Sequence, residues 1–118
     1  MHAFSIPVLR YSLPAGGAVA VNRFVSVANS KAVQAGEDAV VIGVSQNAVE
    51  GNAGVPVSNQ IVEIITGLVP VLAGGAISSG DLVTTNSEGK AVKGTEENAV
   101  GVAITGASAA GALLTVKL

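Results

Sequence analysis

The order of motifs between residues 77 and 118 repeats an order already present between residues 19 and 57. Each copy holds a Lys-Ala-Val run, an acidic pair, an apolar triplet centred on glycine, and a later glycine. The matched landmarks are Lys31-Ala32-Val33 with Lys90-Ala91-Val92, Glu37-Asp38 with Glu96-Glu97, Ile42-Gly43-Val44 with Val100-Gly101-Val102, and Gly54 with Gly111. Their offsets, 90 − 31 = 59, 101 − 43 = 58 and 111 − 54 = 57, differ by single residues. Two copies are too few for a solenoid, which needs about three stacked units. The repeat therefore predicts one small domain with two pseudo-equivalent halves.

Short runs of β-branched and aliphatic residues, separated by Gly, Asn, Ser and acidic residues, fill the chain from residue 18 onward. Such spacing predicts an all-β fold, either a small β-barrel or a sandwich. We expect strands near residues 24–27, 39–44, 60–66, 69–72, 82–85, 91–93, 99–105 and 113–117. The run Val40-Val41-Ile42 is apolar throughout, which is typical of a strand covered on both faces. The Ala-rich stretch 107–114 favours helix by propensity, but Gly106 and Gly111 limit it to a single turn.

The first 17 residues differ in composition from the rest of the chain. They hold two of the three aromatic residues, the single histidine and two of the four prolines. Because proline removes a ladder donor, this segment reads as an extended N-terminal arm rather than a central strand. We expect an arm over residues 1–17 and a single β domain over residues 18–118, with repeat halves at about 19–57 and 77–118. The candidate partner-binding residues are Phe4, Ile6, Pro7, Val8 and Tyr11. Their apolar side chains could pack either against a partner or against this chain's own barrel.

The composition limits the classes of partner. Charged residues make up 12% of the 118 residues and hydrophobic residues 49%, so too few charges remain to cover the outside and some apolar surface should meet another chain. The net charge is −2 and the six cations are scattered, which argues against nucleic acid. No apolar run reaches the 18 or so residues of a membrane span, and the start lacks the cationic leader of a signal peptide. We therefore expect a subunit of an assembly.

The chemistry-bearing residues predict no catalytic, metal or cofactor site. The glycine-rich stretch 74–81 lacks the Lys-Ser/Thr of a phosphate loop, so it reads as a turn, and we expect Gly80, Asp81 and Gly89 to be structural turn residues. The acidic pairs recur in both copies, as solvated turns would, although weak cation binding there is conceivable. The sole histidine, His2, lies beside the terminus, where a catalytic base is rarely held in place. We expect no enzyme.

Several segments together resemble the capsid cement, or head-decoration, proteins of tailed bacteriophages. The segments are residues 62–71, 73–83, 89–92, 100–103 and 110–116. The resemblance implies an all-β protein that binds the major capsid protein on the outer surface of the virion, after synthesis in the host cytoplasm. It also implies a homo-oligomer, with a trimer favoured by analogy, and no cofactor, nucleic acid or membrane partner. The alternative is a β-barrel module that binds a glycan or small molecule, against which the 3% aromatic content weighs.

Overall fold

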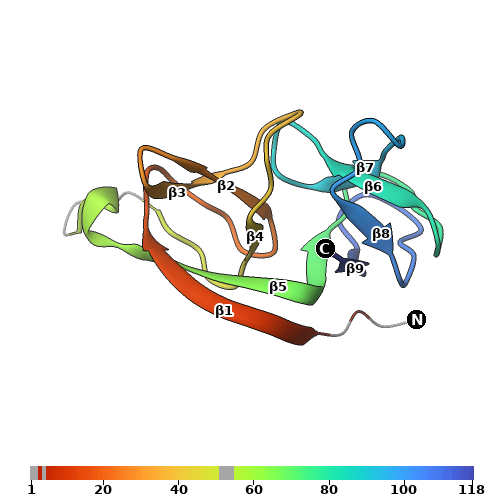
Figure 1. Ribbon diagram of the computed structural model, residues 1–118, viewed down its shortest axis with the longest axis horizontal. Coiled ribbons are helices and arrows are strands. Elements are labelled where there is room, and N and C mark those ends of the chain that lie inside the picture. Colours follow the sequence, from red (N-terminus) through yellow and green to blue (C-terminus); the bar gives the residue numbers. More distant parts are fainter. Residues whose placement is uncertain (1–2, 4, 51–54) are drawn as a thin grey trace.

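The protein is all-β, as predicted. The computed structural model describes residues 3, 5–50 and 55–118 (Figure 1). Within these ranges, nine strands form one curled antiparallel sheet, and a single three-residue 3-10 helix precedes β5. The elements are β1 (Ile6–Pro14), β2 (Phe24–Ala28), β3 (Lys31–Gln34), β4 (Gly43–Ser45), η1 (Val57–Asn59), β5 (Ile61–Leu72), β6 (Leu82–Thr85), β7 (Ala91–Lys93), β8 (Gly101–Ala103) and β9 (Leu113–Lys117).

The strand bounds agree with the sequence better in the second half than in the first, although β8 covers only Gly101–Ala103 of the strand expected at 99–105. Strands β6, β7 and β9 have the predicted bounds, whereas the two strands expected at 60–66 and 69–72 are one continuous strand, β5. The strand expected at 39–44 is wrong over most of its length, because only Gly43–Ser45 joins the ladder and Val40 is 77% exposed. Val41 instead packs on the core from a loop. The chain at 107–114 has no helix; it turns and then enters β9.

The two halves have the same strand pairing, which confirms the predicted pseudo-repeat. In the first half β2 pairs with β3 and β4, β4 pairs with β5, and β5 pairs with β1. In the second half β6 pairs with β7 and β8, β8 pairs with β9, and β9 pairs with β5. The first part of β5 thus belongs to one half and its last part to the other. Parallel bridges, Ala15 to Ala32 and Ala73 to Ala91, bring each curled half back toward its first strand.

The structural repeat begins earlier than residue 19. Residues 15–18 and 73–76 are both Ala-Gly-Gly-Ala, and their offset of 73 − 15 = 58 matches that of the later landmarks. The N–H of Gly16 donates to the carbonyl of Ala32 at 2.7 Å, and the N–H of Gly74 donates to Ala91 at 2.7 Å. With the same offset of 58, residues 6–14 of β1 correspond to residues 64–72, the last part of β5. The Gly54 landmark of the predicted repeat lies outside the described residues.

Each half has its own hydrophobic core, built from equivalent residues. The first core holds Ala15, Val19, Val25, Ala32, Val49, Val62 and Ile64. Their counterparts Ala73, Ile77, Val83, Ala91, Ala107, Leu114 and Val116 lie in the second core. The second core also takes in Phe24, Val44 and Ile65 from the first half. Apolar burial contributes about 25 cal/mol per Å², so these three side chains hold the halves together.

Candidate partner-binding surface

Strand β1 is an edge strand with apolar side chains on its outside. Its ladder partner is β5, in a register that runs from Ile6 opposite Leu68 to Pro14 opposite Ile61. The exposed fractions are 58% for Ile6, 82% for Val8 and 55% for Leu9. Proteins normally protect a free sheet edge with charges, prolines, bulges or a covering element, and β1 has the exposed charge of Arg10 and a bulge at Val8. Here the apolar outer side chains leave an edge that a partner could cover, and β1 follows the lower border of the molecule in Figure 1.

A bulge explains why neighbouring residues of β1 both face outward. Side chains of a regular strand alternate between its two faces. The register of β1 shifts between Pro7 and Leu9, so Val8 has no partner on β5. Opposite this bulge, Gly67 has φ 104°, and a Cβ there would lie 2.7 Å from the backbone nitrogen of Val8. The glycine therefore permits the bulge, and the bulge re-aims Val8.

Beyond the bulge, β1 turns Tyr11 and Leu13 toward the first core. The hydroxyl of Tyr11 donates to the carbonyl of Ile42 at 2.6 Å, which ties β1 to the loop that precedes β4. Desolvation by burial raises the pKa of Tyr11 above its ordinary value. The apolar edge is therefore held rigidly before any partner arrives, and a preorganised surface loses less conformational entropy on binding.

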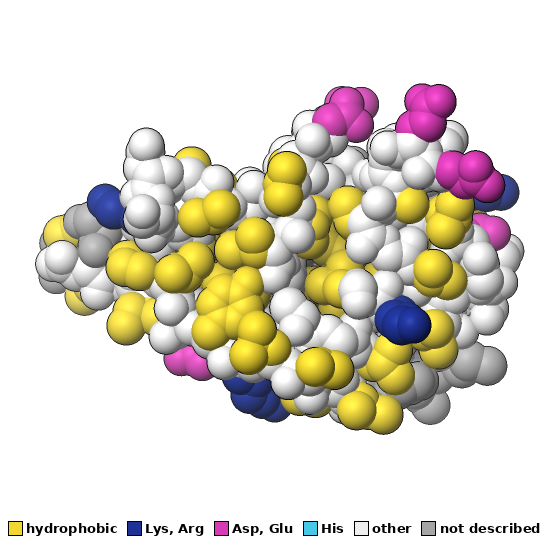
Figure 2. All heavy atoms as spheres, viewed as in Figure 1, with side chains coloured by type: hydrophobic (Ala, Val, Ile, Leu, Met, Phe, Trp, Pro, Cys, Tyr) yellow, Lys and Arg dark blue, Asp and Glu magenta, His cyan; other side chains and the backbone are white. Residues whose placement is uncertain are grey.

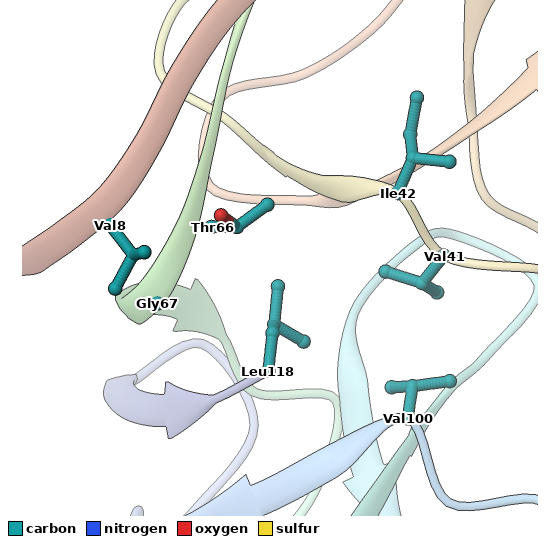
Figure 3. A pocket seen from close by; sticks show the side chains of 7 residues that line it. All are labelled: Val8, Val41, Ile42, Thr66, Gly67, Val100 and Leu118. Carbon is teal, nitrogen blue, oxygen red and sulfur yellow. The ribbon is translucent and has the colours of Figure 1, made fainter.

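An apolar hollow of about 290 Å³ adjoins the bulge, at the seam between the halves. It is lined by Val8, Val41, Ile42, Thr66, Gly67, Val100 and Leu118. Figure 3 shows Val41, Val100 and Leu118 directed toward one another from three separate segments, with Val8 on the far side of Gly67. The N–H of Leu118 donates to the carbonyl of Gly67 at 3.0 Å and fixes the chain end there. Among the described residues, no Asp, Glu, Lys, Arg or His side chain lines this hollow. It could therefore receive one apolar side chain of a partner.

The comparison with known families decides which kind of protein this is. The family model described as phage cement protein matches residues 5–118. The chain belongs to the phage cement protein family. Its fold is shared with the structure described as "head fiber gp8.5 N base in bacteriophage phi29", at a TM-score of 0.73 and 21% sequence identity. The match covers 92% of this chain and 91% of the phage phi29 chain. No curated protein matches this cement protein in sequence.

The structure brings together three of the five predicted partner-binding residues. Ile6, Pro7 and Val8 follow one another along the edge of this cement protein, whereas Tyr11 is turned toward the core. Phe4 lies outside the described residues, as does His2. Leu9 and the residues that line the hollow from other segments are not predicted from the sequence. Ile42 and Val100 are repeat counterparts, but nothing in the sequence indicates that they approach β1.

The predicted turn residues lie in turns away from the β1 edge. Gly80 has φ 90° and Gly89 has φ 73°. A carboxylate oxygen of Asp81 accepts a hydrogen bond from the N–H of Ser78 at 2.9 Å, which closes the turn before β6. In the described ranges, no group of three or more His, Cys, Asp or Glu side chains could hold a metal ion. Within the same residues, no helix has the length and apolar character needed to cross a bilayer.

Proposed function

We propose that this cement protein decorates the outer surface of a phage head and stabilises the lattice of the major capsid protein, without catalysing a reaction. Family membership over residues 5–118 is the observation that carries the proposal. A protein that binds the assembled lattice but not its separated subunits stabilises that lattice by mass action. This role requires an exposed binding surface rather than a catalytic group.

The apolar edge of β1 and the adjoining hollow are the proposed capsid contact. Burying the side chains of Ile6, Val8 and Leu9 would contribute about 1.5–3 kcal/mol each before ordering costs. An extended segment of the major capsid protein could also pair with the free edge of β1, because backbone groups at a sheet edge accept a further strand. Tyr11 and Gly67 take part by holding the edge and its bulge in place.

We further propose that the protein acts as a homo-oligomer, with a trimer favoured by analogy with other decoration proteins. Several linked copies convert later contacts with the lattice into intramolecular events, so a modest contact per copy is sufficient for tight binding. The described chain exposes apolar side chains away from β1 as well, among them Val21, Val27 and Val55. These side chains are candidates for the contact between copies.

The test is the addition of Val8→Asp protein to undecorated, expanded capsids. Since Val8 is 82% exposed, its replacement should leave the melting temperature unchanged. We expect capsid binding to weaken at least tenfold, since burying a carboxylate in an apolar contact costs more than the roughly 1.4 kcal/mol of a tenfold change. The matched control is Val40→Asp, an equal change at a side chain that is 77% exposed on the loop before β4. Equal occupancy of capsids by the Val8 variant and the wild type, measured by cryo-EM, would place the contact elsewhere.

A further inference from the structure

The seam between the halves is formed by two surfaces, and each of them has a repeat counterpart elsewhere in the chain. The surface on the first half is a wall of three paired strands, from which Phe24, Val44 and Ile65 enter the second core and are 0% exposed. The surface on the second half is the turn between β6 and β7, where the carbonyl of the buried Gly89 accepts a hydrogen bond from the N–H of Phe24 at 2.8 Å. The repeat provides a second wall on the second half and a second turn on the first half. We call these counterparts the outer wall and the outer turn.

The outer wall turns its apolar side chains outward. Leu82 pairs with Val102, and Val102 with Lys117, in the same register as the three wall residues of the first half. Leu82 and Val102 are half-buried and Lys117 is exposed, whereas their counterparts are fully buried. Val83 and Val116, the neighbours of Leu82 and Lys117, lie in the second core. Because side chains alternate along a strand and directly paired residues share a face, the outer wall faces away from that core.

The outer turn, between β2 and β3, is exposed as well. Ser30 is the counterpart of Gly89, with the offset of 89 − 30 = 59 that relates the two Lys-Ala-Val runs. The two residues have similar backbone angles, φ 64° at Ser30 and 73° at Gly89, but Ser30 is exposed. On the strand before the turn, Val27 is 46% exposed, whereas its counterpart Thr85 is 1% exposed. The first half thus exposes the surface that the second half buries in the seam.

The outer wall and the outer turn lie toward opposite ends of the molecule. Its extents are 41 × 28 × 25 Å, and the long axis is horizontal in Figure 1. Figure 1 shows the turn between β2 and β3 near the left end and strands β6 and β8 in the right half. In the same view, Figure 2 shows hydrophobic side chains over both halves, while most of the acidic side chains project from the upper edge. The outer wall therefore cannot reach the outer turn of its own chain, but it can reach that of another copy.

We propose that copies of this protein pack head to tail, with the outer turn of one copy on the outer wall of the next. This contact deepens the proposed homo-oligomer and rests on it. The N–H of Leu82 would donate to the carbonyl of Ser30 of the neighbouring copy, as the N–H of Phe24 donates to Gly89 in the seam. Contacts of this kind join unlike surfaces, so they close into a ring when the rotation between copies allows it. The proposed trimer would be such a ring.

One residue of the outer wall makes this contact weaker than the seam. Lys117 stands at the position of Ile65, which is fully buried. The aliphatic part of a lysine side chain can cover apolar surface, but its ammonium group stays in water. The contact should therefore be reversible in solution and gain strength where several copies are held close together on a lattice.

The first test is disulfide cross-linking between copies, which is specific because the chain has no cysteine. Ser30→Cys and Lys93→Cys place one thiol on the outer turn and one beside the outer wall, and both positions are exposed. Lys93 is the counterpart of Gln34, whose Cγ lies 2.9 Å from a Cβ at Gly89 in the seam. The two full-length variants, mixed under mild oxidation, should form a mixed disulfide roughly tenfold faster than Lys93→Cys forms one with the control, Ser12→Cys on β1.

The cross-link distinguishes this contact from other modes of assembly. A selective mixed disulfide, in solution or on decorated capsids, supports the head-to-tail contact. Faster formation of either variant's own disulfide would indicate a contact between like surfaces and would overturn the proposal. Wild-type oligomers in sedimentation equilibrium without the selective cross-link would overturn the head-to-tail contact but keep the homo-oligomer. Monomers both in solution and on capsids would overturn both.

Two substitutions in the outer wall test the contact in opposite directions. Lys117→Ile restores the residue found in the seam and should tighten self-association about tenfold, because more apolar surface is buried. The matched control, Arg10→Ile on β1, also replaces an exposed cation and should leave the association constant unchanged. Val102→Asp should weaken association about tenfold, since a carboxylate would be buried in the contact. Sedimentation equilibrium measures all three variants, with melting temperatures as the check on folding, and an unchanged constant for Lys117→Ile would contradict the proposal.

Discussion

The first and second halves have equivalent strands and equivalent core residues, but they make different use of their hairpin turns. The turn between β2 and β3 is exposed, whereas the turn between β6 and β7 packs on the first half. There the carbonyl of Glu88 accepts hydrogen bonds from the side chains of Arg23 and Gln34, both at 2.9 Å, and the carbonyl of Gly89 accepts one from the N–H of Phe24 at 2.8 Å. The two halves thus share a topology, but only the hairpin turn of the second half packs on the other half.

The largest expected effect comes from the seam between the halves. Phe24 is fully buried in the second core, whereas its repeat counterpart, Leu82, is half-buried. Phe24→Ala should lower the free energy of unfolding by about 3–5 kcal/mol, through lost apolar burial and a cavity. Leu82→Ala should cost about 1–2 kcal/mol, because less of its side chain leaves water. Urea unfolding measures both. Equal losses would show that the counterparts play the same part and that Phe24 does not join the halves.

A smaller effect is expected where each half needs a glycine for close backbone approach. A Cβ at Gly43 would lie 2.7 Å from the carbonyl oxygen of Ile65, and a Cβ at its counterpart, Gly101, would collide with the carbonyl oxygen of Lys117. Alanine at either position should cost about 1–3 kcal/mol.

The matched controls for these two substitutions are Gly17→Ala and Gly75→Ala. Nothing lies within 4 Å of a Cβ at either of these positions. Both variants should stay within about 0.5 kcal/mol of the wild type in urea unfolding. A tolerated alanine at Gly101 but not at Gly43 would show that the halves have diverged in their packing as well as in their turns.

The third comparison concerns the turn glycines Gly80 and Gly89, which both have a positive φ. Alanine at such a position should lower the free energy of unfolding by about 1 kcal/mol or more. Gly89→Ala should cost more than Gly80→Ala. A Cβ at Gly89 would lie 2.9 Å from Cγ of Gln34, whereas nothing lies within 4 Å of a Cβ at Gly80. The melting temperatures of the two variants measure the difference. The reverse order would argue against a close contact of the β6–β7 turn with the first half.

The smallest effect concerns the tyrosine that anchors β1. Burial raises the pKa of Tyr11 above its ordinary value of 10.0. Above pH 10 or so the unfolded chain releases this proton while the folded chain keeps it, so the free energy of unfolding falls as pH rises through the folded pKa. Below about pH 10 the tyrosine keeps its proton in both states, so the stabilisation that Tyr11 gives the folded chain is fully present. Tyr11→Phe should lose about 1 kcal/mol at neutral pH, through its hydrogen bond, and show a flatter decline as the pH rises above about 10. Parallel pH profiles for both proteins would contradict this assignment.

The sequence predicts the second half better than the first, for a physical reason. Strands β6, β7 and β9 follow glycine and polar turns closely, so local signals mark both of their ends. In the first half, Val40 and Val41 are apolar without joining the ladder, because one is exposed and the other packs on the core from a loop. The prolines of β1 predict an extended arm; in the structure residues 6–14 form an edge strand, where missing donors are also tolerated.

The partner-binding surface could be predicted only in part. Ile6, Pro7 and Val8 are neighbours in the sequence, so their shared exposure follows from one strand. The bulge that re-aims Val8 depends on Gly67, about 60 residues away, and the hollow beside it depends on Val100 and Leu118 from the other half. Proximity of this kind comes from strand register, which the residues of one segment do not determine.

Strand β5 determines how this protein would carry a mechanical load. Its residue Leu68 is paired with Ile6 of β1 on one side and with Lys117 of β9 on the other. A force that pulls β1 and β9 apart along the direction of β5 would therefore act in shear, and the hydrogen bonds of a ladder loaded in this way share the force and break together. A force across the ladder would open the same bonds one at a time. If β1 is fixed to a shell, the direction of the load relative to β5 decides how firmly the second half is held.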